Sequence, residues 1–115
     1  ILVNILTSYV VGKPPSGVSD YVVGKYSLLG LTKSMAVELG KFGIRVNSIS
    51  PSMVNSPLTD KLPSKLKEIT KSQIPLESRL AEPMEVAGIA LFLCSEHANY
   101  INGENILVTG GSSMN

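Results

Sequence analysis

The stretch ILVNILTS, residues 1–8, opens on an apolar run that is rich in β-branched side chains, from Ile1 to Leu6. An apolar run of this length without alternation is typical of a parallel strand buried on both faces. Thr7 and Ser8 then fall where this strand is expected to end. Because the chain opens directly on the strand and without an initiator methionine, we expect it to be a fragment of a longer protein.

A long helix is expected next. Residues 12–17 contain two prolines and two glycines, which indicate a loop. The helix is expected to begin between Ser16 and Asp20, where Ser and Asp side chains can cap it, and to run to about Leu39. Small residues recur along one of its stripes: Gly24, Ser27, Gly30 and Ser34. Glycine inside a helix costs up to about 1 kcal/mol relative to alanine, so close packing against another backbone is the expected compensation.

The remaining elements alternate strand and helix. We expect a strand at Ile44–Ile49 that ends at Pro51 and a mobile helix between Leu58 and Gln73 within the polar segment 52–81. Pro83, at a first helical position, is expected to open a helix at Met84–Ser95, and a last strand is expected at Ile106–Val108. The Met84–Ser95 helix is apolar on nearly every side and is therefore expected to be buried. The order predicts an α/β fold, with three parallel strands, right-handed crossovers and a sheet covered on both faces.

Composition excludes several functional classes. The 115 residues are 43% hydrophobic and 17% charged with a net charge of +1, so we expect neither disorder nor broad attraction to nucleic acid or anionic membrane. No apolar run approaches the roughly 20 residues that span a bilayer. Cys94, the only cysteine, is expected in the core and fits a reducing, cytoplasmic setting. His97, the only histidine, leaves almost no ligand set for a metal site.

Tyr21 and Lys25 lie four residues apart, which on a helix places a phenol and an ammonium on one face, one turn apart. An ammonium beside a phenol favours the phenolate, and a tyrosine tuned in this way can exchange a proton with a substrate hydroxyl near neutral pH. Any amphipathic helix can carry such a pair by chance, so the spacing alone is a weak signal.

The position of Ser8 makes the pattern more specific. It lies thirteen residues before Tyr21, at the carboxyl end of the first expected strand, where ligands bind in open α/β sheets. A hydroxyl there can hold a substrate carbonyl oxygen while the tyrosine protonates it. The alternative is a turn hydroxyl that bonds its own backbone. Tyr9 and Tyr26 flank these residues and either line the pocket or simply pack.

Taken together, the motifs resemble the classical short-chain dehydrogenase/reductase family, including its 3-oxoacyl-carrier-protein reductase-like members. The resemblance covers essentially the whole chain, and its motifs are Val3 to Ser8, Tyr21 to Lys25, GIRVNSISP at 43–51, RLAEPMEVA at 79–87 and VTGG at 108–111. The implied fold is the C-terminal half of a doubly wound, Rossmann-type sheet. Residues 1–115 would be the C-terminal catalytic part of one domain whose N-terminal half binds the cofactor, and 52–81 would be a substrate lid.

The resemblance also implies catalytic roles. Tyr21 would be the catalytic acid/base, Lys25 would tune it and hydrogen-bond the nicotinamide ribose, and Ser8 would orient and polarise the carbonyl. The family's glycine-rich phosphate loop, its catalytic asparagine and the residue that selects NAD or NADP have no counterpart in these 115 residues. We therefore expect the isolated chain to be inactive.

Cofactor contacts are implied around Pro51. The backbone of Val54 would meet the nicotinamide carboxamide, and Ser56 stands where the family often has threonine. There are two departures from the family pattern, since Ser52 replaces a glycine and Thr109 replaces an aspartate.

The resulting hypothesis is an NAD(P)-dependent oxidoreductase that acts on a small-molecule carbonyl or secondary alcohol, as a homodimer or homotetramer. The alternative is a non-catalytic fragment or oligomerisation module that lacks its cofactor site.

Overall fold

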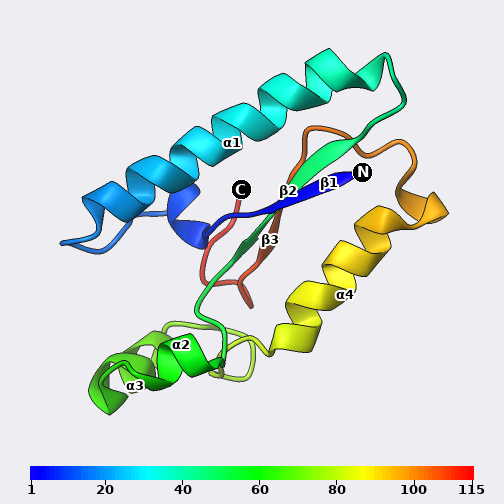
Figure 1. Cartoon of the computed structure of the whole chain (residues 1–115). Helices are drawn as coiled ribbons and strands as arrows, with labels where there is room; N and C mark the ends of the chain where they lie inside the picture. Colours follow the sequence, from blue (N-terminus) through cyan, green and yellow to red (C-terminus); the bar gives the residue numbers. More distant parts are fainter.

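The protein is described by a computed structural model that covers residues 1–115. Strands and helices alternate along the chain (Figure 1), as β1 (Leu2–Ile5), α1 (Ser19–Gly40), β2 (Val46–Pro51), α2 (Pro57–Asp60), α3 (Ser64–Ser72), α4 (Pro83–Cys94) and β3 (Asn105–Val108), with short 3-10 helices η1 (Ser8–Val10) and η2 (Glu96–Ala98). The predicted α/β class is confirmed. The single helix expected between Leu58 and Gln73 is instead divided into α2 and α3, because Pro63 interrupts it.

The three strands form one parallel sheet in the order β1-β2-β3. Ile5 of β1 pairs with Ile49 of β2, and Ile49 pairs with Ile106 of β3. Because the strands are parallel, their carboxyl ends share one edge of the sheet. That edge therefore gathers the residues that follow Ile5, Pro51 and Val108.

The central strand β2 is the buried part of the sheet, although half of its residues are polar. Residues 46–50 are all buried. The hydroxyls of Ser48 and Ser50 donate to Oδ1 of Asn105 on β3, at 3.0 and 2.7 Å. These bonds satisfy polar groups that would otherwise be costly to bury.

Strand β1 corrects the expectation of a strand buried on both faces. Leu2 and Ile5 are 41% and 46% exposed. Among residues 1–115, β1 pairs only with β2, so no other strand of these residues lies against its second edge. An apolar run predicts a parallel strand. It does not predict which other strands that strand pairs with, and the pairing decides how exposed its side chains are.

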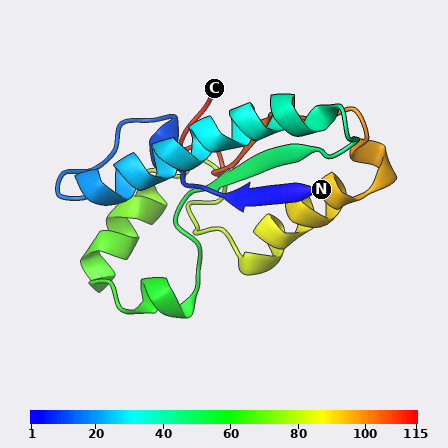
Figure 2. The ribbon, with the colours of Figure 1, turned by 45° about the horizontal axis from the view of Figure 1, so that its top comes forward.

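Helices α1 and α4 cover opposite faces of the sheet (Figures 1 and 2). On the α4 face, Ile49, Leu93 and Ala98 form the buried core cluster. On the α1 face, the Asn4 amide donates to the Thr32 hydroxyl at 3.0 Å. The sheet is therefore covered on both faces, as predicted.

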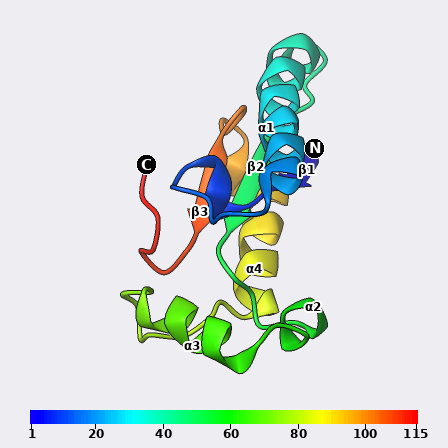
Figure 3. The same ribbon diagram turned by 90° about the vertical axis from the view of Figure 1, so that its left-hand side faces the viewer.

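This arrangement makes the two crossovers opposite in hand, because both advance in the same direction across the sheet while their helices lie on opposite faces. The expectation of right-handed crossovers throughout is wrong for the β2–α4–β3 connection. Figure 3 shows α2 and α3 displaced from the sheet between β2 and α4. This long excursion separates α4 from the twist of β2, which is what normally imposes the right-handed path.

Two expectations about the helices are also wrong. Helix α1 has Val18 at its N-cap with no side-chain cap, so Ser19 and Asp20 lie inside the first turn rather than capping it. Helix α4 begins at Pro83 as predicted, but only Leu93 is buried within it, and Cys94 is exposed. A helix that is apolar all round buries only the face that meets a partner, and α4 meets the sheet on one side. No helix is both long and apolar enough to cross a membrane.

Candidate active site

Of the predicted catalytic residues, Ser8 lies at the carboxyl edge of the sheet, whereas Tyr21 and Lys25 lie on α1. Ser8 is the first residue of η1, directly beyond β1, and is 6% exposed. Its backbone carbonyl accepts from the N–H groups of Val11 and Gly12, at 3.0 and 3.1 Å. The η1 turn is thus closed by the carbonyl of Ser8, while its hydroxyl makes no hydrogen bond within the chain. The alternative reading, in which that hydroxyl bonds its own turn, does not describe this geometry.

Tyr21 and Lys25 lie in the N-terminal part of α1, one turn apart. The Lys25 Nζ atom is 5.7 Å from the centroid of the Tyr21 ring. It also donates a 2.8 Å hydrogen bond to the carbonyl oxygen of Ile5, the last residue of β1. The Tyr21 side chain is half exposed, with 47% of the residue accessible. Lys25 therefore connects the helix that carries Tyr21 to the strand end that precedes Ser8.

Tyr9 contacts Tyr21 directly. The two rings meet edge to face, with centroids 6.5 Å apart and planes at 78°. This is a favourable aromatic geometry. Tyr26, by contrast, is 48% exposed. Of the two tyrosines that flank the site in sequence, Tyr9 is the one that packs against Tyr21.

The segment after β2 carries the predicted cofactor residues. Val54 forms an isolated parallel bridge with Ala81, in which the Asn55 N–H donates to Ala81 at 2.8 Å. The Thr59 hydroxyl donates to the Val54 carbonyl at 2.7 Å and accepts from the Ser56 N–H at 3.0 Å. These contacts leave the Val54 N–H without a partner in the chain, so a backbone donor is available beside the end of β2.

The two departures from the family pattern have different surroundings. Thr109 is 5% exposed, and its hydroxyl donates to the Ser113 carbonyl at 2.9 Å. The Ser52 hydroxyl is buried and has no hydrogen-bond partner. It borders a small cavity of about 90 Å³ that is also lined by the end of β3, the turn after it and the 74–81 segment. Thr109 thus closes the turn after β3, while Ser52 leaves an unsatisfied group next to the predicted cofactor segment.

Known proteins resemble this chain over nearly its whole length. Residues 2–113 match the family model described as Enoyl-(Acyl carrier protein) reductase. The chain is 40% identical to the rat (3R)-3-hydroxyacyl-CoA dehydrogenase over 98% of its length and 43% of the relative. It is 42% identical to human Dehydrogenase/reductase SDR family member 4, over 96% of the chain and 40% of that protein.

The chain belongs to the short-chain dehydrogenase/reductase family. A bacterial member, 3-oxoacyl-(acyl-carrier-protein) reductase FabG of Thermotoga maritima, is 41% identical over 83% of the chain and 38% of its own length. The chain thus spans about two fifths of the length of these curated short-chain dehydrogenases/reductases.

Gly110 has a packing role that sequence reasoning missed. In this short-chain dehydrogenase/reductase it adopts a φ of +58°, and a Cβ added there would lie 2.7 Å from the Ile74 side chain. Its carbonyl accepts from the Leu76 N–H at 3.0 Å. Glycine is required because the segment that follows α3 returns against this turn.

An ion-pair cluster around Arg79 holds the end of the 52–81 segment to α4. This contact was not predicted from the sequence. Arg79 pairs with Glu77 at 2.8 Å and with Glu85 at 2.7 Å. The hydrogen bond from Arg79, with another from the Glu82 N–H, lowers the pKa of Glu85 from 4.5 to about 2. The same carboxylates raise the pKa of Arg79. The RLAEPMEVA motif carried the family resemblance, but it did not reveal which of its charges meet.

No group of three His, Cys, Asp or Glu side chains is arranged to hold a metal ion. The predicted site residues supply the Ser8 hydroxyl, the Tyr21 phenol, the Lys25 ammonium and the Val54 N–H, which has no partner in the chain.

Proposed function

We propose that this chain is the C-terminal catalytic part of an NAD(P)-dependent oxidoreductase that reduces a carbonyl or oxidises a secondary alcohol. The observation that carries the proposal is the position of Tyr21, with Lys25 one turn away and bonded to the end of β1 at 2.8 Å. Through that bond Lys25 holds α1, the helix that carries Tyr21, against the end of β1, just before Ser8. The family membership makes this edge the expected location of catalysis.

The chain's own residues would handle the proton. In the reduction, Ser8 donates a hydrogen bond to the substrate carbonyl oxygen, and the Tyr21 hydroxyl transfers its proton to that oxygen as the carbonyl carbon gains a hydride. The Lys25 ammonium favours the phenolate that remains. In the reverse direction the phenolate takes the proton from the alcohol. The hydride is supplied or received by the nicotinamide ring when the cofactor is bound.

The segment after β2 fits a nicotinamide. Pro51 ends the strand, the unpaired Val54 N–H offers a donor to the carboxamide oxygen, and Ser56 begins the short helix that follows. The buried, unpartnered Ser52 hydroxyl lies in the same segment. We propose that residues 51–56 hold the nicotinamide. An N-terminal half of the protein would bind the rest of the NAD or NADP molecule.

The relatives' names guide the choice of substrate. Two of them act by name on 3-hydroxyacyl or 3-oxoacyl groups. Both groups contain the carbonyl or secondary alcohol that the Ser8–Tyr21 chemistry requires. A 3-oxoacyl compound is therefore the first substrate to test.

The exposed, unpaired Cys94 fits a reducing compartment such as the cytoplasm.

We propose further that the protein is a homodimer or homotetramer. The small-residue stripe of α1 faces solvent, and a Cβ built at Gly24 or Gly30 would meet no atom within 4 Å. The stripe therefore does not pack inside this chain, which leaves it available to a second copy. Light scattering that shows only monomer at micromolar concentration would rule the oligomer out.

The decisive experiment replaces Tyr21 with phenylalanine in the complete protein. Tyr21→Phe keeps the ring that packs on Tyr9 and removes only the hydroxyl. We expect turnover of a 3-oxoacyl substrate with NADH or NADPH to fall by about 100-fold or more, with an unchanged circular dichroism spectrum. Tyr26→Phe, which removes the hydroxyl of a half-exposed tyrosine five residues further along α1, is the matched control. Wild-type turnover in Tyr21→Phe would show that the proton-transfer assignment is wrong.

A further inference from the structure

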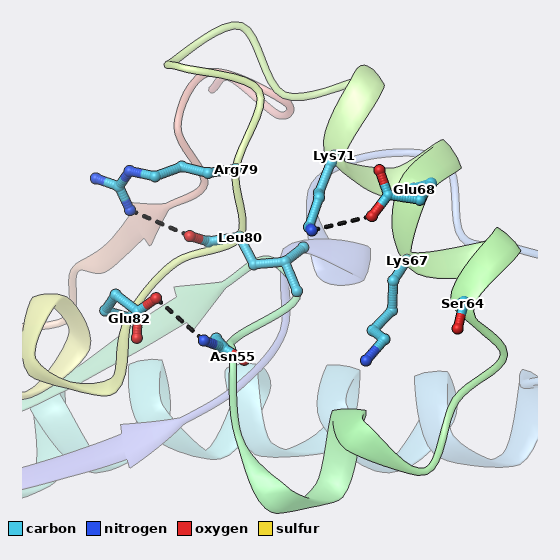
Figure 4. A pocket seen from close by; sticks show the side chains of 8 residues that line it. All are labelled: Asn55, Ser64, Lys67, Glu68, Lys71, Arg79, Leu80 and Glu82. Carbon is cyan, nitrogen blue, oxygen red and sulfur yellow. Dashed lines mark hydrogen bonds and ion pairs between the residues drawn. The ribbon is translucent and has the colours of Figure 1, made fainter.

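A second cavity lies apart from the end of β1, between α3 and the segment that leads into α4. Its volume is about 330 Å³. Figure 4 shows Ser64 and Lys67 on the α3 side, Asn55 and Glu82 on the opposite side, and Leu80 between them. Leu80 is 5% exposed, so the base of the cavity is well packed while its walls are polar.

The cavity has one ammonium without a carboxylate partner. Three cations line it, and two of them are already paired. Lys71 meets Glu68 at 3.0 Å, and the Arg79 guanidinium is engaged by Glu77 and Glu85. Lys67 has no carboxylate within 4.0 Å, although its side chain is drawn toward the cavity in Figure 4 and the residue is partly buried. A partly buried ammonium is stabilised by an anion, and no carboxylate of the cavity lies within ion-pair distance of Lys67.

The opposite wall carries the carboxylate of Glu82, which is not part of an ion pair. Glu82 accepts a hydrogen bond from the Asn55 amide at 3.2 Å and forms no ion pair. Its remaining lone pairs can accept from a hydroxyl or an amide N–H of a ligand. The cavity thus offers a cation on one wall and an acceptor on the other.

We infer that this cavity binds an organic anion, a carboxylate or a phosphate ester, with the acidic group on Lys67 and Ser64 and a hydroxyl or amide of the same molecule on Glu82. The inference rests on the proposed function in one respect. If 52–81 is the substrate lid, the anion belongs to the substrate, whereas a phosphate of the nucleotide cofactor offers the same chemistry.

Binding can be measured without any turnover. The lysines of the complete protein are reductively methylated with ¹³C-formaldehyde, which keeps their charge, and inorganic phosphate is titrated while the methyl resonances are followed by NMR. The Lys67 resonance is assigned by its loss in Lys67→Arg. We expect it to shift and saturate, while that of Lys65, an exposed lysine on the same turn, hardly moves. Equal, non-saturating shifts of both lysines would overturn the inference, because they indicate general ionic contact. A Lys67 resonance that does not move would overturn it as well, because Lys67 then serves another purpose, such as closing the cavity onto Glu82.

The source of the anion is decided by inhibition kinetics. We expect the inhibition constant of phosphate to rise roughly tenfold in Lys67→Gln and to change less than about twofold in Lys65→Gln. Competition with the carbonyl substrate assigns the anion to the substrate, and competition with the nucleotide assigns it to the cofactor. Equal inhibition constants in both variants would overturn the site. Failure of the proposed function is separable, because a fully active Tyr21→Phe would leave the NMR result standing.

Discussion

Lys25 donates a 2.8 Å hydrogen bond to the carbonyl oxygen of Ile5, which joins α1 to the last residue of β1. The same ammonium lies 5.7 Å from the centre of the Tyr21 ring. One side chain therefore both places a positive charge beside the phenol and connects its helix to the strand end before Ser8. This double contact makes Lys25 the most informative position to change.

Lys25→Met should lower kcat by about 100-fold, because it removes both the charge that favours the phenolate and the bond to Ile5. Steady-state kinetics on the complete protein measure the effect. Lys33→Met, at an exposed position on the same helix, should change kcat less than about twofold. Equal losses in the two variants would show that helix stability, rather than the site, accounts for the effect.

Tyr9 should act through the orientation of Tyr21. Tyr9→Phe keeps the edge-to-face contact and should retain most activity, whereas Tyr9→Ala should lower kcat by roughly tenfold because it frees a half-exposed ring. The kcat and KM of both variants are measured. If Tyr9→Phe lost as much activity as Tyr9→Ala, the hydroxyl of Tyr9 would have a role of its own.

The buried hydroxyls of Ser50 and Ser52 should differ in their effect on stability. Ser50 donates to Asn105 at 2.7 Å, so Ser50→Ala should lower the free energy of unfolding by about 1 kcal/mol. Ser52 has no partner, so Ser52→Ala should leave that free energy unchanged or slightly raised. Urea unfolding of the complete protein compares the two. A clear loss in Ser52→Ala would mean that a water in the adjoining cavity satisfies the hydroxyl.

The Arg79–Glu85 pair should make the free energy of unfolding depend on pH in the acidic range. Glu85 has a lower pKa in the folded protein, about 2, than its ordinary value of 4.5, so unfolding takes up a proton at low pH. Its contribution is therefore complete above about pH 4.5 and is lost as the pH falls toward 2. Both side chains are about two-fifths exposed, so solvent screens the effect.

The test is the difference in Tm between wild type and Glu85→Gln, followed from pH 7 to pH 3. We expect this difference to shrink as the pH falls. Glu96→Gln, at an exposed carboxylate without an ion pair, should show a small difference that does not depend on pH in this way. A difference for Glu85→Gln that stayed constant would mean that the pair does not form in solution.

The proposed lid should be mobile over only part of residues 52–81. Leu58, Leu66 and Ile69 are 78%, 43% and 47% exposed, so α2 and α3 bury little apolar surface. Ile74 and Leu80 are buried, which anchors the end of the segment. Amide hydrogen exchange should be fast over 57–73 and slower over 74–81, and substrate with cofactor should slow the former. Exchange over 57–73 as slow as in β2 would show that α2 and α3 are a fixed part of the fold.

The sequence by itself determined the features that arise within a few residues of each other. The order of strands and helices, the start of α4 at Pro83 and the placement of Tyr21 and Lys25 on one helix face all follow from periodicity, proline and side-chain spacing. The family could also be predicted, because its motifs are short, local and ordered along the chain. These properties depend on the backbone geometry of one element at a time.

Only the tertiary structure decided what depends on partners distant in sequence. It placed β2 between β1 and β3 and buried residues 46–50, although nothing in the local pattern of β2 distinguishes a central strand. It placed α1 and α4 on opposite faces, and it exposed Cys94 on an apolar helix with one covered side. It also directed Lys25 to a carbonyl twenty residues away and left Lys67 unpaired in a cavity. Burial and charge pairing depend on which surfaces meet in the folded chain. Local sequence patterns do not predict contacts between residues that are far apart in the sequence.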